Sequence, residues 1–65
     1  MKFSLNQRIA ECDREIRLRR QDYPSLVRKG VMRQGEADMH IEIMSAVKET
    51  LCWLQTNEQQ ILAAM

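Results

Sequence analysis

Side chains that could carry chemistry are few and scattered in this sequence. The only histidine is His40, and the only cysteines are Cys12 and Cys52. A structural zinc site needs four ligands, and neither cysteine belongs to a CxxC or similar spacing. A catalytic histidine needs a nucleophile or an acid beside it in a pocket, and no Ser/His/Asp or Cys/His arrangement supplies one. We therefore expect no catalytic residue, no metal and no cofactor.

The densest group of charges is a run of arginines, which is the usual electrostatic footprint of a nucleic-acid-binding helix. Acidic residues are interleaved with these arginines, and the formal net charge of the whole chain is only +1. Nucleic-acid contact through Arg14, Arg17 and Arg20 is therefore the alternative hypothesis and not the leading one. Arg19 belongs to the same run, but we expect it to meet a carboxylate such as Glu42 across a helix interface.

Any site in this chain must be built on a very small fold, because the sequence has 65 residues. A chain of this length buries only roughly 60% of the surface that its unfolded form exposes. Domains this small usually gain stability from disulfides, a metal or oligomerisation. Residues 1–65 are therefore interpreted as one domain that needs a second chain. Without a visible secretory leader or an apolar run of about 18 residues, we expect a cytoplasmic protein with reduced thiols and no membrane contact.

The apolar pattern predicts a first helix over about residues 5–29. Its capping-box start is Ser4 followed by Gln7. A heptad seam with alternating steps of four and three then runs through Leu5, Ile9, Cys12, Ile16, Arg19, Tyr23 and Leu26. Pro24 lacks a backbone N–H and disfavours helical torsions at the residue before it. We therefore expect a kink or a short break near residues 22–24.

The second helix is expected over about residues 34–63, after a turn at about 30–33 that begins with Gly30. Two apolar stripes run along it. The first, called the inner seam, contains Ala37, His40, Met44, Val47, Leu51, Leu54, Glu58, Ile61 and Met65. The second, called the outer stripe, contains Met39, Ile43, Ala46, Thr50 and Trp53. Together they form an apolar arc wider than one neighbouring helix can cover.

These features predict an all-α fold, an antiparallel hairpin of two helices with a Pro-kinked first helix. The excess apolar surface indicates that the hairpin dimerises into a four-helix bundle or forms a higher homo-oligomer. The residues expected at a subunit or partner interface are Met39, Ile43, Ala46, Trp53, Ile61 and Leu62. The residues expected to brace the turn are Arg19, Tyr23, Pro24, Gly30 and His40.

The residues around the turn resemble a group of short helical proteins of temperate phages and prophages, with the pattern E-[IL]-x-[ML]-R-R-x-x-Y-P-x-x-V-x-x-G-x-M-x4-A-x3-I-x2-M. The matching positions cover about half of the chain and include Glu15, Tyr23, Gly30 and Met44. The resemblance implies an accessory protein of a lambda-like phage, located in the cytoplasm of a bacterial host cell. It brings no catalytic residues with it. The chain departs from this pattern at Arg33 and Gly35, where the similar proteins have a Ser N-cap and a better helix former.

The leading hypothesis is therefore a non-enzymatic phage accessory or regulatory protein. It would act as a helical homo-oligomer by binding a host or phage protein. The alternative is a small dimeric protein that binds nucleic acid or modulates transcription through the stretch from Arg14 to Arg20.

Overall fold

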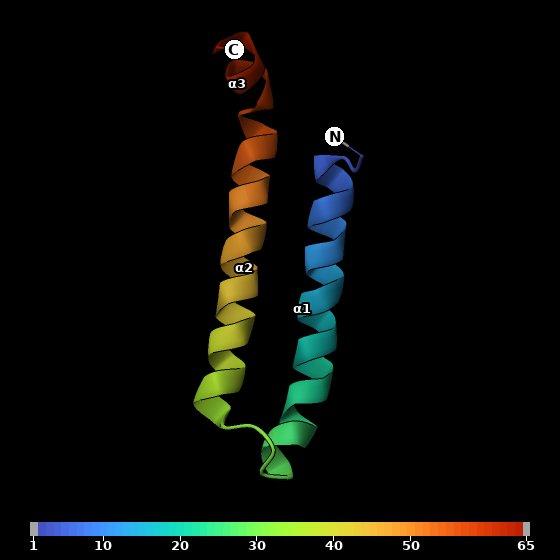
Figure 1. Cartoon of the computed structure of the whole chain (residues 1–65), viewed down its shortest axis with the longest axis vertical. Helices are drawn as coiled ribbons and strands as arrows, with labels where there is room; N and C mark the ends of the chain where they lie inside the picture. The colour runs from blue at the N-terminus through green and yellow to red at the C-terminus, as the bar shows by residue number, and fades with distance from the viewer. Residues whose placement is uncertain (1, 65) are drawn as a thin grey trace.

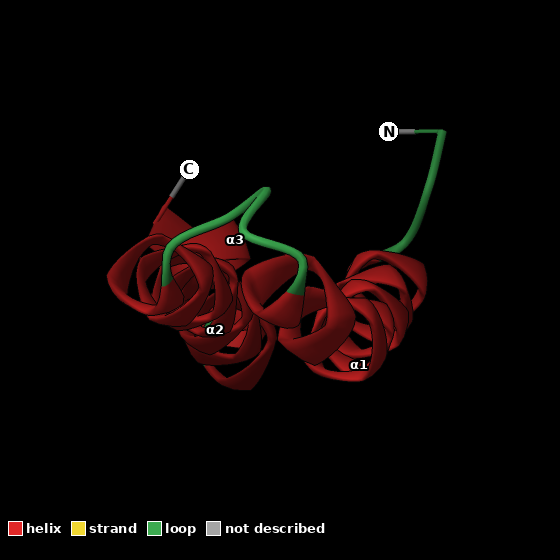
Figure 2. Ribbon diagram, turned by 90° about the horizontal axis from the view of Figure 1, so that it is seen from below, coloured by secondary structure: helices red, strands yellow, loops and turns green. Residues whose placement is uncertain are grey.

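Two long helices packed side by side make up most of this protein (Figure 1). The computed structural model describes residues 2–64, and residues 1 and 65 lie outside it. Helix α1 spans Leu5–Arg28, α2 spans Gln34–Thr56 and α3 spans Glu58–Ala64. Seen end-on, α1 and α2 form a single layer with the turn crossing one end (Figure 2). The all-α helical hairpin expected from the sequence is confirmed, with a short third helix added.

The start of α1 is fixed by the capping box that the sequence indicates. The backbone N–H of Gln7 donates to Ser4 Oγ at 3.1 Å, and the backbone N–H of Ser4 donates to Gln7 Oε1 at 2.9 Å. Each side chain thereby satisfies a backbone donor that the first helical turn leaves free. The expected start at Leu5 follows from this reciprocal pair.

The break expected at residues 22–24 is absent, because α1 runs without interruption through Pro24 to Arg28. The proline ring fixes a φ close to that of a helix, so its main cost is the missing hydrogen bond to the carbonyl of Arg20. Both Arg20 and Pro24 are exposed, so water can hydrate that carbonyl. The helix therefore continues past the proline. Of the two alternatives expected there, a kink or a short break, the break was wrong.

Gly30 ends α1 in a Schellman motif. Its φ is +75°, in the left-handed region that glycine adopts without steric cost. The backbone N–H of Gly30 donates to the carbonyl of Val27 at 3.1 Å, and that of Val31 donates to the carbonyl of Leu26 at 3.0 Å. These two bonds reverse the chain over a few residues and so allow α2 to return along α1.

The second helix expected over residues 34–63 is divided at Asn57. This residue has φ −103° and ψ 10°, outside the helical range, and its side-chain Nδ2 donates to the carbonyl of Trp53 at 2.8 Å. Asparagine favours such local side-chain bonds over a regular helix. The backbone bond from Ile61 N–H to the carbonyl of Asn57 still links the two segments at 2.9 Å. The result is α2 followed directly by α3.

Very little of the chain is enclosed. Among residues 2–64 the buried side chains are Ile16 of α1, 9% exposed, and Ala37 of α2, 2% exposed. The rest of the interface between the helices is half-buried and includes Ile9, Met44 and Leu51. Two helices that touch along one line leave most of each surface open, so a hairpin of this kind has only a strip of core.

Candidate interaction surfaces

The molecule exposes far more surface than a compact protein of its mass. Its solvent-accessible area is 5359 Å², whereas a typical folded monomer of 7.7 kDa exposes about 4,300 Å². Its radius of gyration is 15.4 Å, against about 11 Å for a globular chain of this length. The excess of about 1,000 Å² is similar to the roughly 800 Å² that each partner contributes to a standard protein interface. The shape therefore favours association with another chain.

The outer stripe is the most exposed apolar feature of α2. Met39, Ile43 and Trp53 are 48%, 52% and 59% exposed, and Ala46 is exposed between them. At 100° per residue these positions point away from the side of α2 that carries buried Ala37. Contact with α1 therefore does not cover the stripe, and a partner remains free to use it.

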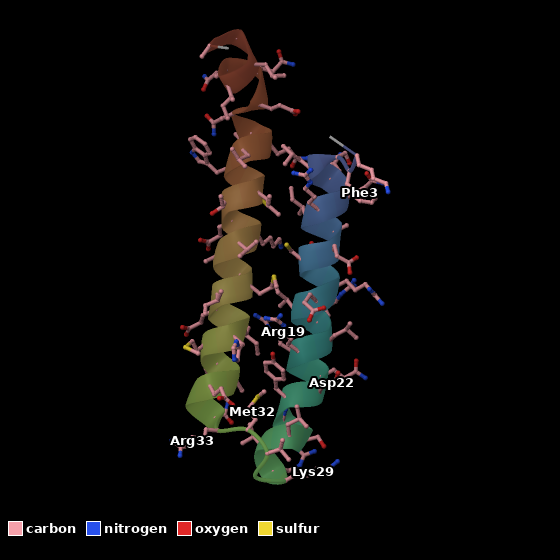
Figure 3. The ribbon with its side chains drawn as sticks, viewed as in Figure 1. Phe3, Arg19, Asp22, Lys29, Met32 and Arg33 are labelled. Atoms are coloured by element: carbon pink, nitrogen blue, oxygen red, sulfur yellow. The ribbon has the colours of Figure 1, made fainter. Side chains whose placement is uncertain are left out.

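A second apolar surface lies at the open end of the hairpin, where α3 extends past the start of α1 (Figure 1). We call it the open-end groove, and its apolar walls are Phe3, Leu5, Leu54, Ile61 and Leu62. Phe3 is labelled beside the start of α1 in Figure 3. Leu62 is 63% exposed and Phe3 is 54% exposed. Ile61 and Leu62, expected at an interface, thus join residues from α1 and α2 in one surface.

The opposite side of the hairpin carries charge. Lys48 Nζ lies 2.6 Å from Asp13 Oδ1 and ties the middle of α2 to α1. The hydrogen bond that Lys48 donates to this carboxylate, and the negative charge of the carboxylate, raise the pKa of Lys48 above the ordinary value of 10.5. Arg17, Arg20 and Glu49 line the same shallow groove. The groove thus holds both positive and negative side chains, and neither sign of charge dominates.

The arginines considered for nucleic-acid contact lie beside carboxylates. Arg14 Nη1 lies 3.0 Å from Glu11 Oε1 on the exposed side of α1. Arg17 and Arg20 lie on the groove that also holds Asp13 and Glu49. A phosphate backbone approaching these cations would therefore also meet carboxylates, which lowers the electrostatic attraction.

The residues expected to brace the turn come together in part. Arg19 reaches from α1 to α2 and donates from Nη1 to the backbone carbonyl of His40 at 3.0 Å (Figure 3). Its Nε also donates to Glu15 Oε1 at 3.1 Å within α1. The expected contact with Glu42 was wrong, because these two acceptors take its place. The rings of Tyr23 and His40 meet edge to face with centroids 6.5 Å apart.

The remaining residues of that set lie apart from the contact between Arg19 and His40. Gly30 is in the turn itself, and Pro24 is exposed on α1 beside a small hollow that Tyr23 and Ala37 also line. Arg19 links the two helices through its hydrogen bond to the carbonyl of His40, and the ring contact of Tyr23 with His40 lies at the same junction. The cluster is therefore suited to holding the hairpin.

Two polar links between the helices were missed in the sequence. They join Lys48 to Asp13 and Gln55 to Asn6, and in the second pair Gln55 Nε2 donates to Asn6 Oδ1. In both pairs the residue numbers add to 61, as expected for antiparallel helices folded about Gly30 and Val31. Pairing positions about the turn would therefore have found them. Phe3 was also missed, because it precedes the heptad pattern.

Three further features of residues 2–64 concern metal ligands, thiols and long apolar helices. Within this range, no three His, Cys, Asp or Glu side chains gather closely enough to hold a metal ion. Cys12 and Cys52 are half-buried free thiols. None of the described helices is both long enough and apolar enough to cross a membrane.

Comparisons with protein-family models, with curated proteins and with solved structures find no match to this chain.

Proposed function

We propose that this protein is a non-enzymatic helical module that self-associates and acts by binding another protein. The observation that carries the proposal is the imbalance between its core and its apolar surface. Two side chains are buried in residues 2–64, while eight large apolar side chains are exposed there. Exposed apolar surface of this extent on a small protein marks an interaction site.

The open-end groove is the surface we assign to self-association. It is apolar on three sides, formed by residues before α1, by the end of α2 and by α3. The half-buried inner seam, including Leu51 and Leu54, leads into it from the middle of α2. A second hairpin packed on this side would cover the seam and the groove together and complete a four-helix bundle. The proposal also includes an accessory or regulatory role in a temperate phage, for which the support is the resemblance of the turn residues to short phage proteins.

Sedimentation equilibrium at micromolar concentration tests the self-association. We expect the wild type to sediment as a dimer and Leu62→Asp to shift toward monomer, because a carboxylate in the groove would lose its water. Val31→Asp is the matched control, since Val31 is 72% exposed at the turn and far from the groove. A stably folded wild-type monomer, or equal dissociation of both variants, would contradict the proposal.

A gel-shift titration separates protein binding from the nucleic-acid alternative. Binding through Arg14, Arg17 and Arg20 would produce a complex at low salt that weakens steeply as salt is added. We expect no such complex, because Glu11, Asp13 and Glu49 accompany these cations. A salt-sensitive complex that is lost in Arg17→Gln with Arg20→Gln would favour the alternative.

A further inference from the structure

We propose that the outer stripe of α2 is a docking site for a cationic amphipathic helix of a partner protein. This inference deepens the proposed function, because it names the kind of partner. It depends on the claim that the protein binds another protein and not on its self-association. The spacing of the stripe, its exposure and the charges along its border all support such a partner.

The spacing of the stripe is that of a coiled-coil seam. Its members follow one another at steps of four, three, four and three, which is the pattern that accepts a second helix through knobs-into-holes packing. From Met39 to Trp53 the stripe is about 21 Å long at 1.5 Å per residue. A partner helix of three to four turns would therefore cover it.

The shape of the stripe favours close approach of a helix. The small residues Ala46 and Thr50 lie in the middle, between the larger Ile43 and Trp53. The Thr50 hydroxyl donates to the carbonyl of Ala46 at 3.2 Å, so its hydrogen bond is already made within α2. A helix that covers the stripe would leave that donor satisfied, and burying Thr50 therefore costs little.

The border of the stripe identifies the charge of the partner. Glu42 and Glu49 flank it on one edge, seven residues apart, while Val47 and Leu54 flank it on the other. Within residues 2–64 the side chain of neither glutamate takes part in an ion pair or a hydrogen bond. A partner helix with Lys or Arg along one edge, at the same seven-residue spacing, would pair with both.

A second copy of this chain fits the border poorly. If two α2 helices paired antiparallel across their stripes, the edges carrying Glu42 and Glu49 would meet each other and repel. If they paired parallel, the same glutamates would face Val47 and Leu54 and lose water without gaining a cation. Neither arrangement supplies the missing positive charge. The glutamates at the border therefore favour a basic partner helix and disfavour pairing with a second copy of α2.

Trp53 provides a direct readout, because it is the only tryptophan in the chain and is 59% exposed. The probes are two synthetic 21-residue helices with leucine at the heptad core positions and either lysine or glutamate at the flanking positions. We expect the lysine peptide to shift Trp53 emission to the blue and to bind at least tenfold more tightly than the glutamate peptide at low salt. Binding of both peptides with equal affinity, or of neither, would overturn the proposal.

Charge reversal of the border tests which residues select the peptide. Glu42→Lys with Glu49→Lys should invert the preference, so that the glutamate peptide binds more tightly. The matched control is Glu11→Lys with Asp22→Lys, which makes the same change in net charge on α1 and should keep the preference for lysine. If the control also came to prefer the glutamate peptide, the preference would depend on the net charge of the protein. That result would contradict a local site at Glu42 and Glu49. Circular dichroism of each variant verifies that the helices are retained.

Two further measurements separate this site from self-association. Leu62→Asp should leave the binding of the lysine peptide unchanged, whether or not it dissociates the dimer. Trp53 emission without peptide should not change with protein concentration. A blue shift on concentrating the protein alone would mean that a second copy occupies the stripe, and would overturn the inference. The lysine peptide can bind even if sedimentation shows a monomer, so the two proposals fail separately.

Discussion

The two glycines of the chain sit in opposite structural situations. Gly30 has a φ of +75° in the turn, whereas Gly35 lies in the first turn of α2 with no positive φ. An added methyl group would meet no atom within 4 Å at either position. The difference between the two residues therefore comes from backbone conformation alone, which makes them a matched pair.

We predict that Gly30→Ala lowers the free energy of unfolding by about 1 to 2 kcal/mol, because an L-residue is strained in the left-handed region. Gly35→Ala should raise it by about 0.5 kcal/mol, since alanine loses less backbone freedom in a helix. Urea denaturation at one fixed protein concentration measures both changes. Equal effects of the two substitutions would show that the turn does not depend on Gly30.

Some single-residue features could be predicted because their signals are local. Ser4 with Gln7, and Gly30 at the end of α1, act on backbone groups only a few residues away. The contact of Arg19 could not be predicted in the same way. Its partner on α2 is the backbone carbonyl of His40, and every residue offers a carbonyl whatever its side chain.

At the scale of elements, two residues that disfavour helices affect their helices differently. Pro24 remains inside α1, where it gives up one backbone bond on an exposed face. Asn57 divides the second helix at a backbone conformation outside the helical range, where its side-chain Nδ2 and its backbone N–H both donate to the carbonyl of Trp53. The sequence pattern indicated a break at the proline and none at the asparagine. Heptad spacing reports which side of a helix is apolar but not whether each backbone hydrogen bond forms.

Asn57→Ala should join α2 and α3 into one helix. Alanine has no side-chain donor to compete for the backbone, and its helix propensity exceeds that of asparagine by about 0.5 kcal/mol. Circular dichroism at 222 nm should show more helix than in the wild type. Gln60→Ala is the control, because Gln60 is exposed in α3 and is already a good helix former. If both variants gain the same helicity, Asn57 is not the cause of the division.

At the scale of the molecule, we expect stability and association to be coupled. A hairpin with Ile16 and Ala37 as its buried residues in 2–64 has little core of its own, so a second chain would supply much of its apolar burial. The heptad pattern could predict this need, because it showed more apolar surface on the second helix than one neighbour covers. The same pattern also separated the outer stripe from the inner seam. It could not predict the open-end groove, since the groove depends on where α3 and Phe3 lie in space.

The thermal midpoint should therefore rise with protein concentration. Each tenfold increase favours a dimer by about 1.4 kcal/mol, which corresponds to about 5 °C for two chains of this size unfolding together. Thermal melts at 1, 10 and 100 µM, roughly spanning the expected range of association, measure the shift. Leu62→Asp should show a smaller shift than Val31→Asp. A midpoint that does not depend on concentration would contradict coupled folding and association.

The hairpin also determines where a group fused to the chain, or a label attached to it, would lie on the molecule. Residues before α1 and the whole of α3 lie at one extremity of a particle 51 Å long, and the turn at Gly30 lies at the other (Figure 1). Anything joined to either end of the chain is therefore carried beside the open-end groove. A label at the turn, in contrast, sits far from both ends and leaves the groove and the outer stripe free, so Val31 is the natural position for a probe or a tether.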